Sequence, residues 1–533
     1  MASEPPTWTR RDHLQRLIAG ERFESLVIGG GVTGCGTALD LAVRGISVAL
    51  VERHDFACGT SSRSTKLFHG GIRYLPQFRF GLVAEGLREQ EVLARIADYL
   101  FQPLEFLVPV YRQYGLADAP AWAARGRRAS VALRLGLILY DLLGGLNRPG
   151  KRHHKLTREE FLQLAPRVRT EGLRSGFAYS DAQTDDARLV IALARTAVNH
   201  GAIAVNRVMV TAVNPVRDGY VVQMEDALSG DRFAVEARTV VAATGAFPSP
   251  AVGDAPPLEM THSKGTHLVV RKGLVGLGEH ALVLPRTDDG RILYIVPWAG
   301  HALIGTTDTP YVGDPAHPAA TAADIEYLIR HVVQYLDVGS FEPLSTFAGL
   351  RALADDGGGP TAKASREHVI EEARPGFVRV AGGKLTTYRR ISATTAGLVA
   401  RRLRVAGKSP SAATLLTGAG STAPISGDNL WRRYGAESAS IRALIATNPE
   451  WGRTLSDNVT LLGEVVHATR HESAVSISDI TLRRTRLAWL SMQHSREDQE
   501  AIGRTMGAEL GWSESELARQ IADHEEELAI EGL

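Results

Sequence analysis

Cysteine is nearly absent from this sequence, which has only Cys35 and Cys58 among its 533 residues. Both stand among small residues next to a glycine-rich segment, so we expect buried thiols rather than a disulfide, and a reducing compartment. The sequence also lacks any uninterrupted apolar run of about eighteen residues, the length that spans a bilayer. Its first 22 residues contain no apolar core of the secretory type. We therefore expect a cytoplasmic chain that does not span a membrane.

An excess of either charge is missing as well. Lys and Arg number 60 and Asp and Glu number 59, which gives a formal net charge of +1 at pH 7. Nucleic-acid-binding domains are usually strongly basic, so we predict no nucleic-acid partner, although local basic patches remain compatible with this composition. The length predicts about two to four domains.

What the sequence does contain is a complete β-α-β pattern over residues 23–53. A short apolar strand leads into Gly29, Gly31 and Gly34, which have the G-x-G-x-x-G spacing at the start of a helix, and a second strand ends at Glu52. The glycines permit a tight turn and a close approach of backbone to a pyrophosphate, and the helix N-terminus offers unpaired N–H groups to the anion. A carboxylate at Glu52 can accept hydrogen bonds from a ribose. Since all these features occur in register, a dinucleotide site is favoured over a purely structural glycine turn.

The segment 55–75 is rich in small residues and hydroxyl groups, and a loop of this kind is a functional candidate. Its hydroxyls and its lysine can serve phosphates or a ribityl chain, and His69-Gly70-Gly71 lets backbone pass close to a flat ring. The alternative is a solvated surface loop. The candidate ligands are Thr60, Ser61, Ser62 and Lys66.

The chain later returns twice to the first sheet. An apolar strand ends in Thr244-Gly245, and a strand followed by a glycine turn places Gly383 and Lys384 at a further helix start. Between these returns, residues 261–380 alternate like an antiparallel sheet with one wet face, which carries Lys264, Arg351 and Arg366. Such an excursion is typical of FAD enzymes and unusual in nicotinamide enzymes.

Residues 125–155 contain an apolar helix flanked by cations. Leu133, Leu135, Leu137, Ile138, Leu142 and Leu143 lie between Arg125, Arg127 and Arg128 on one side and Lys151 to Lys155 on the other. The helix is too short to span a bilayer but long enough to lie in an anionic interface. A core helix with solvated ends fits these residues equally well.

Nearly the whole chain closely resembles the FAD-dependent, respiratory glycerol-3-phosphate dehydrogenases. The segments that carry the resemblance, in chain order, are IGGGVTGCGTALDLAVRG, LVERHDFACGTSSRSTKLFHGGIRYL, YSDAQTDDARLV, KGTHLVV, IVPW, IGTTDTPYVGDP, AGLRAL, GGKLTTYR and LRRTRLAWL. Two positions depart from the family: Ala352 stands where proline commonly follows the arginine, and Ala246-Phe247 stands in place of Pro-Trp.

The resemblance implies an α/β and α+β multidomain fold. It comprises a Rossmann-like FAD domain of glutathione-reductase type, an antiparallel-sheet substrate domain of D-amino-acid-oxidase type and a C-terminal α-helical domain. We place the FAD domain at 1–80, 181–260 and 377–405, a mainly helical insertion at 81–180, the substrate domain at 261–376, a linker at 406–429 and the helical domain at 430–533.

The resemblance also implies the reaction: oxidation of glycerol 3-phosphate to dihydroxyacetone phosphate by hydride transfer to flavin N5, with electrons passed to a membrane quinone. We predict non-covalent FAD, no metal, a homodimer, and peripheral association with the inner face of the cytoplasmic membrane. Besides the groups already named, the predicted FAD contacts are Val32, Thr33, Arg53, Leu67, His69, Gly70, Val210, Ala243, Leu385 and Thr386.

A phosphate dianion calls for forked guanidinium groups, and a developing alkoxide calls for a cation and a proton acceptor. We predict that six residues hold the substrate: Arg73, Tyr74, Lys264, Arg351, Arg366 and Lys384. The predicted catalytic residues are His69, Arg351 and Lys384, of which Arg351 orients the oxidised hydroxyl and His69 accepts its proton. Three alternatives remain: an oxidase that uses O2, an amine-oxidising flavoenzyme, and a non-catalytic flavin-binding scaffold.

Overall fold

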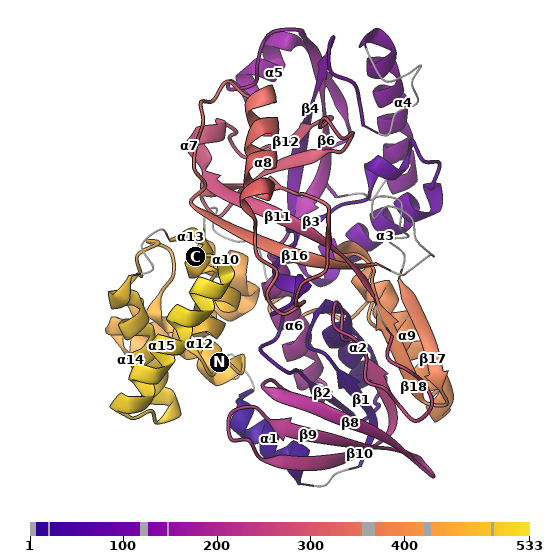
Figure 1. Ribbon diagram of the computed structural model, residues 1–533, viewed down its shortest axis with the longest axis vertical. Coiled ribbons are helices and arrows are strands. Elements are labelled where there is room, and N and C mark those ends of the chain that lie inside the picture. The colour runs from indigo at the N-terminus through magenta and orange to yellow at the C-terminus, as the bar shows by residue number, and fades with distance from the viewer. Residues whose placement is uncertain are drawn as a thin grey trace.

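The computed structural model describes residues 7–19, 22–117, 126–145, 149–258, 260–353, 368–420, 428–491 and 495–533. This part of the chain forms an eight-stranded sheet, a ten-stranded sheet and a group of C-terminal helices. In Figure 1 the ten-stranded sheet occupies the upper half and the eight-stranded sheet the lower half, with the C-terminal helices, in yellow, packed at one side.

The eight-stranded sheet is the predicted nucleotide-binding sheet. Its strand order is β17-β18-β10-β1-β2-β7, in which β18, β10, β1, β2 and β7 are parallel, while β8 and β9 extend it from β10. The strands are β1 (Phe23–Ile28), β2 (Val48–Val51), β7 (Ile203–Val205), β8 (Val208–Val216), β9 (Gly219–Asp226), β10 (Arg232–Ala242), β17 (Val369–Arg374) and β18 (Phe377–Ala381).

Helices cover the parallel strands because those strands are apolar on both faces. One face packs on α2 (Val32–Val43), which lies between α6 (Asp186–Asn199) and α9 (Tyr388–Leu403). The other face is covered by the β8–β9–β10 meander and by α1 (Arg10–Ile18). The β-α-β prediction is confirmed, and the third glycine, Gly34, lies in the first turn of α2, where it lets the helix pack close to the loop after β1.

The ten-stranded sheet contains the predicted substrate-domain strands. Its order is β15-β11-β14-β13-β12-β4-β6-β3, with β16 paired to β11 and β5 paired to β6. Its strands are β3 (Leu67–Phe68), β4 (Gln102–Tyr111), β5 (His154–Leu156), β6 (Leu173–Gln183), β11 (Thr261–Arg271), β12 (Ala281–Leu284), β13 (Leu293–Trp298), β14 (His301–Gly305), β15 (Thr309–Tyr311) and β16 (Ser345–Leu353). The pairing is antiparallel except between β4 and β12.

Helices pack on both faces of this sheet. One face carries α3 (Phe80–Ile96) and α4 (Gly126–Gly144), and the other carries α5 (Arg158–Leu164), α7 (Lys272–Val275) and α8 (Ala322–Tyr335).

Two domain boundaries drawn from the sequence need correction. The segment 81–180, expected to be a mainly helical insertion, also supplies β4, β5 and most of β6 to the ten-stranded sheet. The reason is that β6 is buried along almost its whole length, so its polar and small residues show no alternation that would mark a strand. In addition, β17 pairs with β18 in the nucleotide sheet, although it falls within the range assigned to the substrate domain.

The C-terminal part is helical, as predicted. Its elements are α10 (Asn429–Tyr434), α11 (Ser438–Thr447), α12 (Leu462–His471), a π-helical turn (Asp479–Arg484), α13 (Leu487–Leu490), α14 (Arg496–Leu510) and α15 (Glu514–Glu531). Among all the described residues, no helix is both long enough and apolar enough to cross a bilayer.

Candidate functional site

Two adjoining cavities lie between the two sheets, and one of them also borders the C-terminal helices. Their volumes are about 400 and 290 Å3. They share a wall, which is formed by Thr60, Ser61, Arg63, Gly245, Ala246 and Leu350. The first cavity, called here the nucleotide cavity, lies over the carboxyl ends of β1 and β2. The second, called the reaction cavity, extends toward β11 and β16 of the ten-stranded sheet.

The glycine loop forms the floor where the two cavities meet. Gly29 has φ +110°, and a Cβ atom there would lie 2.4 Å from the carbonyl oxygen of Ala243. A Cβ atom at Gly34 would lie 1.8 Å from the carbonyl oxygen of Gly29. Only glycine fits at these two positions. Gly31 caps α2 without a side-chain hydrogen bond, and the next N–H, of Val32, donates to Ser61 Oγ at 3.0 Å. The helix therefore presents its positive end to the cavity, as a diphosphate requires.

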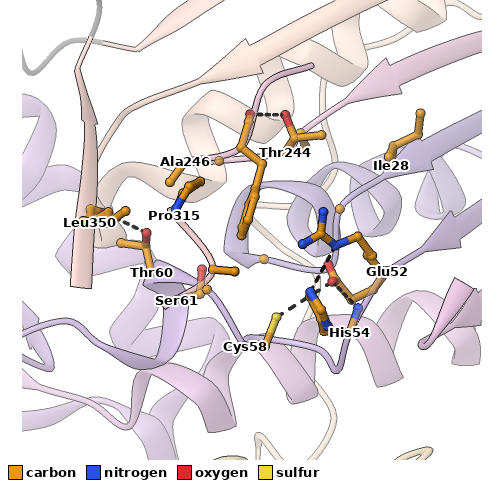
Figure 2. A pocket seen from close by; sticks show the side chains of 18 of the residues that line it. Ile28, Glu52, His54, Cys58, Thr60, Ser61, Thr244, Ala246, Pro315 and Leu350 are labelled. Carbon is orange, nitrogen blue, oxygen red and sulfur yellow. Dashed lines mark hydrogen bonds between the residues drawn. The ribbon is translucent and has the colours of Figure 1, made fainter. Parts of the chain in front are cut away.

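Glu52 closes the far end of the nucleotide cavity. Its carboxylate accepts hydrogen bonds from the backbone N–H groups of Gly30 at 2.6 Å and His54 at 2.8 Å. Burial raises the pKa of Glu52, and these two N–H groups oppose the rise. Figure 2 shows Glu52, His54 and Cys58 on one side of the cavity, with Thr60, Ser61, Leu350 and Pro315 on the other. The carboxylate is thus fixed in place and retains acceptor capacity for a ribose.

The reaction cavity gathers cations around one aromatic ring. Lys384 Nζ lies 4.1 Å and the Arg73 guanidinium carbon 4.9 Å from the centre of the Tyr74 ring, and Arg73 Nη2 donates to the Tyr74 hydroxyl at 3.0 Å. The three residues come from two segments that are three hundred residues apart. They form the binding site that a small dianion would need, with one fork, one ammonium and one phenol.

Arg351 reaches the same cavity from β16. Its guanidinium donates to the Thr307 carbonyl oxygen at 3.2 Å and lies 3.4 Å from Asp308 Oδ1. β16 is paired along its whole length with β11, which fixes Arg351 opposite Ser263. The alanine that follows Arg351 therefore continues a strand, and the orientation of the arginine depends on the sheet rather than on a proline turn.

Two histidines line the reaction cavity. The backbone N–H of His69 donates to Thr386 Oγ1 at 3.1 Å, which ties the HGG segment to the turn before α9. His267 is buried, its Nε2 lies 2.9 Å from Thr65 Oγ1, and its ring stacks on Phe347. Its Nδ1 has no hydrogen-bond partner within the described part of the chain. Burial, assisted by Lys66 and Arg351, holds the pKa of His267 well below its usual value, so this imidazole is neutral.

Most of the predicted site residues line one of these cavities. In the nucleotide cavity they are Gly29, Gly31, Glu52, Arg53, Thr60, Ser61, Val210, Ala243, Thr244 and Gly245. In the reaction cavity they are Val32, Thr33, Leu67, His69, Arg73, Tyr74, Arg351, Gly383, Lys384 and Leu385. Gly34, Ser62, Gly70 and Thr386 lie behind the lining, where Thr386 holds His69 and Gly70 packs against Leu87. Arg366 lies outside the described residues.

The prediction that Lys264 binds substrate is wrong, because its side chain points away from the reaction cavity. Lys264 Nζ lies 2.6 Å from Asp324 Oδ2, at the start of α8, and the pair is almost completely buried. Side chains alternate along a strand, and Gly265 and His267 face the cavity, so Lys264 must face away from it. Its ammonium group neutralises the buried carboxylate of Asp324 and so stabilises the packing of α8 on the sheet.

The prediction that Lys66 contacts the cofactor is also wrong. Lys66 is 1% exposed, and its Nζ donates to Asp186 Oδ1 at 2.9 Å. It lies beneath the loop, whereas its neighbours Thr65 and Leu67 line the reaction cavity.

Several lining residues escaped the sequence analysis. His267 stands two positions after Gly265, so the two-residue period of a strand could have revealed it once that glycine was placed at the cavity. Arg63 directly follows the predicted ligands Ser61 and Ser62, and its charge could have marked it as a further candidate. Further contributions come from a loop, Pro315 to Pro318, and from the C-terminal residues Arg483, Glu527, Ile530 and Glu531. No local pattern connects these with a nucleotide site.

Comparisons with known proteins find similarity along most of the chain. A family model described as FAD dependent oxidoreductase matches residues 24–389, and one described as the C-terminal domain of alpha-glycerophosphate oxidase matches residues 390–517. The chain is 34% identical to glycerol-3-phosphate dehydrogenase 2 of Mycobacterium tuberculosis, over 96% of this chain and 88% of the relative. It is 33% identical to the mitochondrial glycerol-3-phosphate dehydrogenase of Bos taurus, over 97% and 74% of the two chains.

A solved structure is similar over the full length. The glycerol-3-phosphate dehydrogenase of Bacillus halodurans, in complex with FAD, superposes with a TM-score of 0.75 at 26% identity, covering 98% of this chain and 97% of the other.

Proposed function

The chain belongs to the FAD-dependent glycerol-3-phosphate dehydrogenase family, and from this premise we propose that it oxidises glycerol 3-phosphate to dihydroxyacetone phosphate and passes the electrons to a membrane quinone. Its cofactor is FAD. The observation that carries the substrate proposal is the convergence of Arg73, Lys384 and Arg351 on a cavity of about 290 Å3, next to the dinucleotide site. A small phosphate ester matches the charge of these three side chains.

The residues fit FAD at both ends. Glu52 suits the ribose and the N-terminus of α2 suits the diphosphate, while the glycine-lined side of the reaction cavity, at Gly382 and Gly383, leaves room for a flat ring. When bound, FAD supplies the two-electron acceptor that a secondary alcohol needs.

The protein residues then have separate tasks. Arg73, Tyr74 and Lys384 grip the phosphate, and Arg351, held by Thr307 and Asp308, stabilises the oxygen as its proton leaves. The hydroxyl proton requires a neutral acceptor in the same cavity. His69 is the acceptor proposed from sequence, and we add His267, because it lines the same cavity and its ring is neutral.

The decisive experiment is an anaerobic absorption spectrum of the yellow protein before and after addition of glycerol 3-phosphate. We expect rapid bleaching of the flavin by this ester, and none by glycerol or by amino acids. Bleaching by an amino acid would favour an amine-oxidising enzyme, and no bleaching by any polyol phosphate would overturn the proposal in favour of a flavin-binding scaffold.

The electron acceptor is tested separately. A dehydrogenase should reduce a soluble quinone and release little peroxide in air, whereas stoichiometric peroxide would identify an oxidase. Non-covalent attachment of FAD is checked by acid precipitation, which should leave the pellet colourless.

We further propose that the protein binds the cytoplasmic face of the membrane through α4. One face of α4 is core, since Leu137 is fully buried and Leu133 and Leu143 are partly buried. The opposite face exposes Val131, Leu135, Ile138 and Leu142, at the spacing of a helical stripe. Arg128 and Arg134 are exposed beside this stripe, and Figure 1 places α4 at the outer edge of the molecule, away from the C-terminal helices. Arg125 lies outside the described residues.

A further inference from the structure

The last helix of the chain, α15, forms part of the wall of the nucleotide cavity. Glu527, Ile530 and Glu531 line this cavity together with Arg483 from the π-helical turn. The glycine loop and the turn after β2, which belong to the nucleotide-binding sheet, line the same cavity. The cavity for FAD is therefore closed by the C-terminal helices as well as by the two sheets.

A buried ion pair connects α15 with the point where the two cavities meet. The Arg63 guanidinium is paired with the Glu531 carboxylate, and the two side chains are 10% and 8% exposed. Arg63 lines both cavities, close to Ser61, whose hydroxyl accepts from the first N–H of α2. A diphosphate bound at the start of α2 would pass beside this guanidinium.

A second set of ion pairs connects the same helices with the end of β2. Asp55, three residues after Glu52, accepts from Arg483 Nε at 2.6 Å and from Arg484 Nη1 at 2.7 Å, and it is completely buried. Arg483 Nη1 in turn lies 3.0 Å from Glu527 Oε1 of α15. The turn that carries Glu52 is thus fixed by residues from the other end of the chain.

We infer that α15 is the third wall of the FAD site and that the Arg63–Glu531 pair latches it, so that bound FAD and docked α15 stabilise each other. The inference rests on FAD as the cofactor and not on the identity of the substrate. A guanidinium has five N–H donors in a planar fork, so Arg63 can donate to Glu531 and to a diphosphate oxygen at the same time. Glu531 then holds Arg63 in position before FAD arrives.

The test uses the full-length holoenzyme and three variants. Glu531→Gln removes the charge from the latch, Arg63→Gln removes its partner, and Glu526→Gln makes the same charge change on an exposed part of α15. FAD affinity and the rate of FAD release are measured by flavin fluorescence, without substrate. Coupling between two sites is typically about 5- to 150-fold, so we expect Glu531→Gln to weaken FAD binding by a factor in this range and Glu526→Gln to leave it unchanged.

If docked α15 strengthens FAD binding, bound FAD must strengthen the docking of α15 by the same factor. The docking of α15 can therefore be measured separately from FAD affinity. In the wild type and in Glu526→Gln, FAD should slow the hydrogen exchange of the amides of residues 514–533. In Glu531→Gln this protection should shrink by the same factor as the loss of affinity. In the double variant with Arg63→Gln, FAD binding should be no weaker than in the worse single variant, because the two residues act as one unit.

Unchanged or tighter FAD binding in Glu531→Gln, or exchange of α15 that does not respond to FAD, would overturn the inference. A thermal unfolding curve of each apo variant identifies any that fails to fold. If Glu531→Gln does not fold, the comparison is made with Glu531→Asp, which shortens the side chain and keeps its charge, and a shift in FAD affinity is again required.

Discussion

At the scale of single residues, Arg351 is the group most directly assigned to the chemical step. Its guanidinium is held by Thr307 and Asp308 and faces the reaction cavity. We expect Arg351→Ala to lower kcat by about 10²- to 10³-fold, the effect of losing one preorganised donor at a developing oxyanion. FAD content per chain should stay close to one. Near-normal turnover would remove Arg351 from the reaction.

Arg73 and Lys384 should behave differently from Arg351. Both contact the Tyr74 ring and are assigned to the phosphate, which is bound equally in the ground state and in the transition state. Arg73→Ala and Lys384→Ala should therefore raise KM for glycerol 3-phosphate more than they lower kcat. Steady-state kinetics with each variant measures this division, and a fall in kcat at unchanged KM would contradict it.

The proton acceptor is decided by comparing His267→Gln with His69→Gln. We expect the first to lose about 10²- to 10⁴-fold in kcat, the usual contribution of general base catalysis, and the second to lose less. Because the pKa of His267 is held well below its usual value, the wild type should keep its activity as the pH falls through 6.5 and lose it only at lower pH. The opposite ranking of the two variants would return this role to His69.

At the scale of elements, the alternation of side chains along β11 explains what the sequence could and could not predict. Motif positions such as Gly29, Glu52 and Arg351 were predictable, because their spacing fixes both the element and the direction. The direction of the Lys264 side chain was not predictable. In a strand whose register is unknown, a given side chain can point to either face of the sheet. The same register places His267 at the cavity, two residues after Gly265.

The corrected role of Lys264 gives a prediction about stability. Lys264→Met removes the partner of Asp324, a buried carboxylate that also caps α8 through Thr321. We expect the free energy of unfolding to fall by about 1.5–3 kcal/mol, the contribution of a hydrogen bond to a charged group, with KM unchanged. Lys272→Met, which removes the exposed pair with Glu279, is the control and should cost less than about 1 kcal/mol. Chemical denaturation measures both, and a raised KM in Lys264→Met would restore the substrate role.

At the scale of the whole molecule, the site is assembled from segments that are distant in the sequence. The β-α-β unit and its glycines were readable because they are local. The ion pairs from Asp55 to Arg483 and Arg484, and from Arg63 to Glu531, were not, since they join residues that are more than four hundred positions apart. The C-terminal helices read as a separate domain for this reason, although they wall the nucleotide cavity.

The position of α4 at the edge of the molecule leads to the last prediction. Its exposed stripe offers apolar surface, and the arginines beside it should each add about 1 kcal/mol of attraction to an anionic membrane surface. We expect the wild type to pellet with vesicles that contain anionic lipid, less so as salt is raised, and Leu135→Glu/Leu142→Glu to remain largely in the supernatant. Leu228→Glu, at an exposed position of the β9–β10 turn, is the matched control and should pellet like the wild type. Equal pelleting of all three proteins, or of none, would leave α4 as a core helix whose outer face has no membrane role.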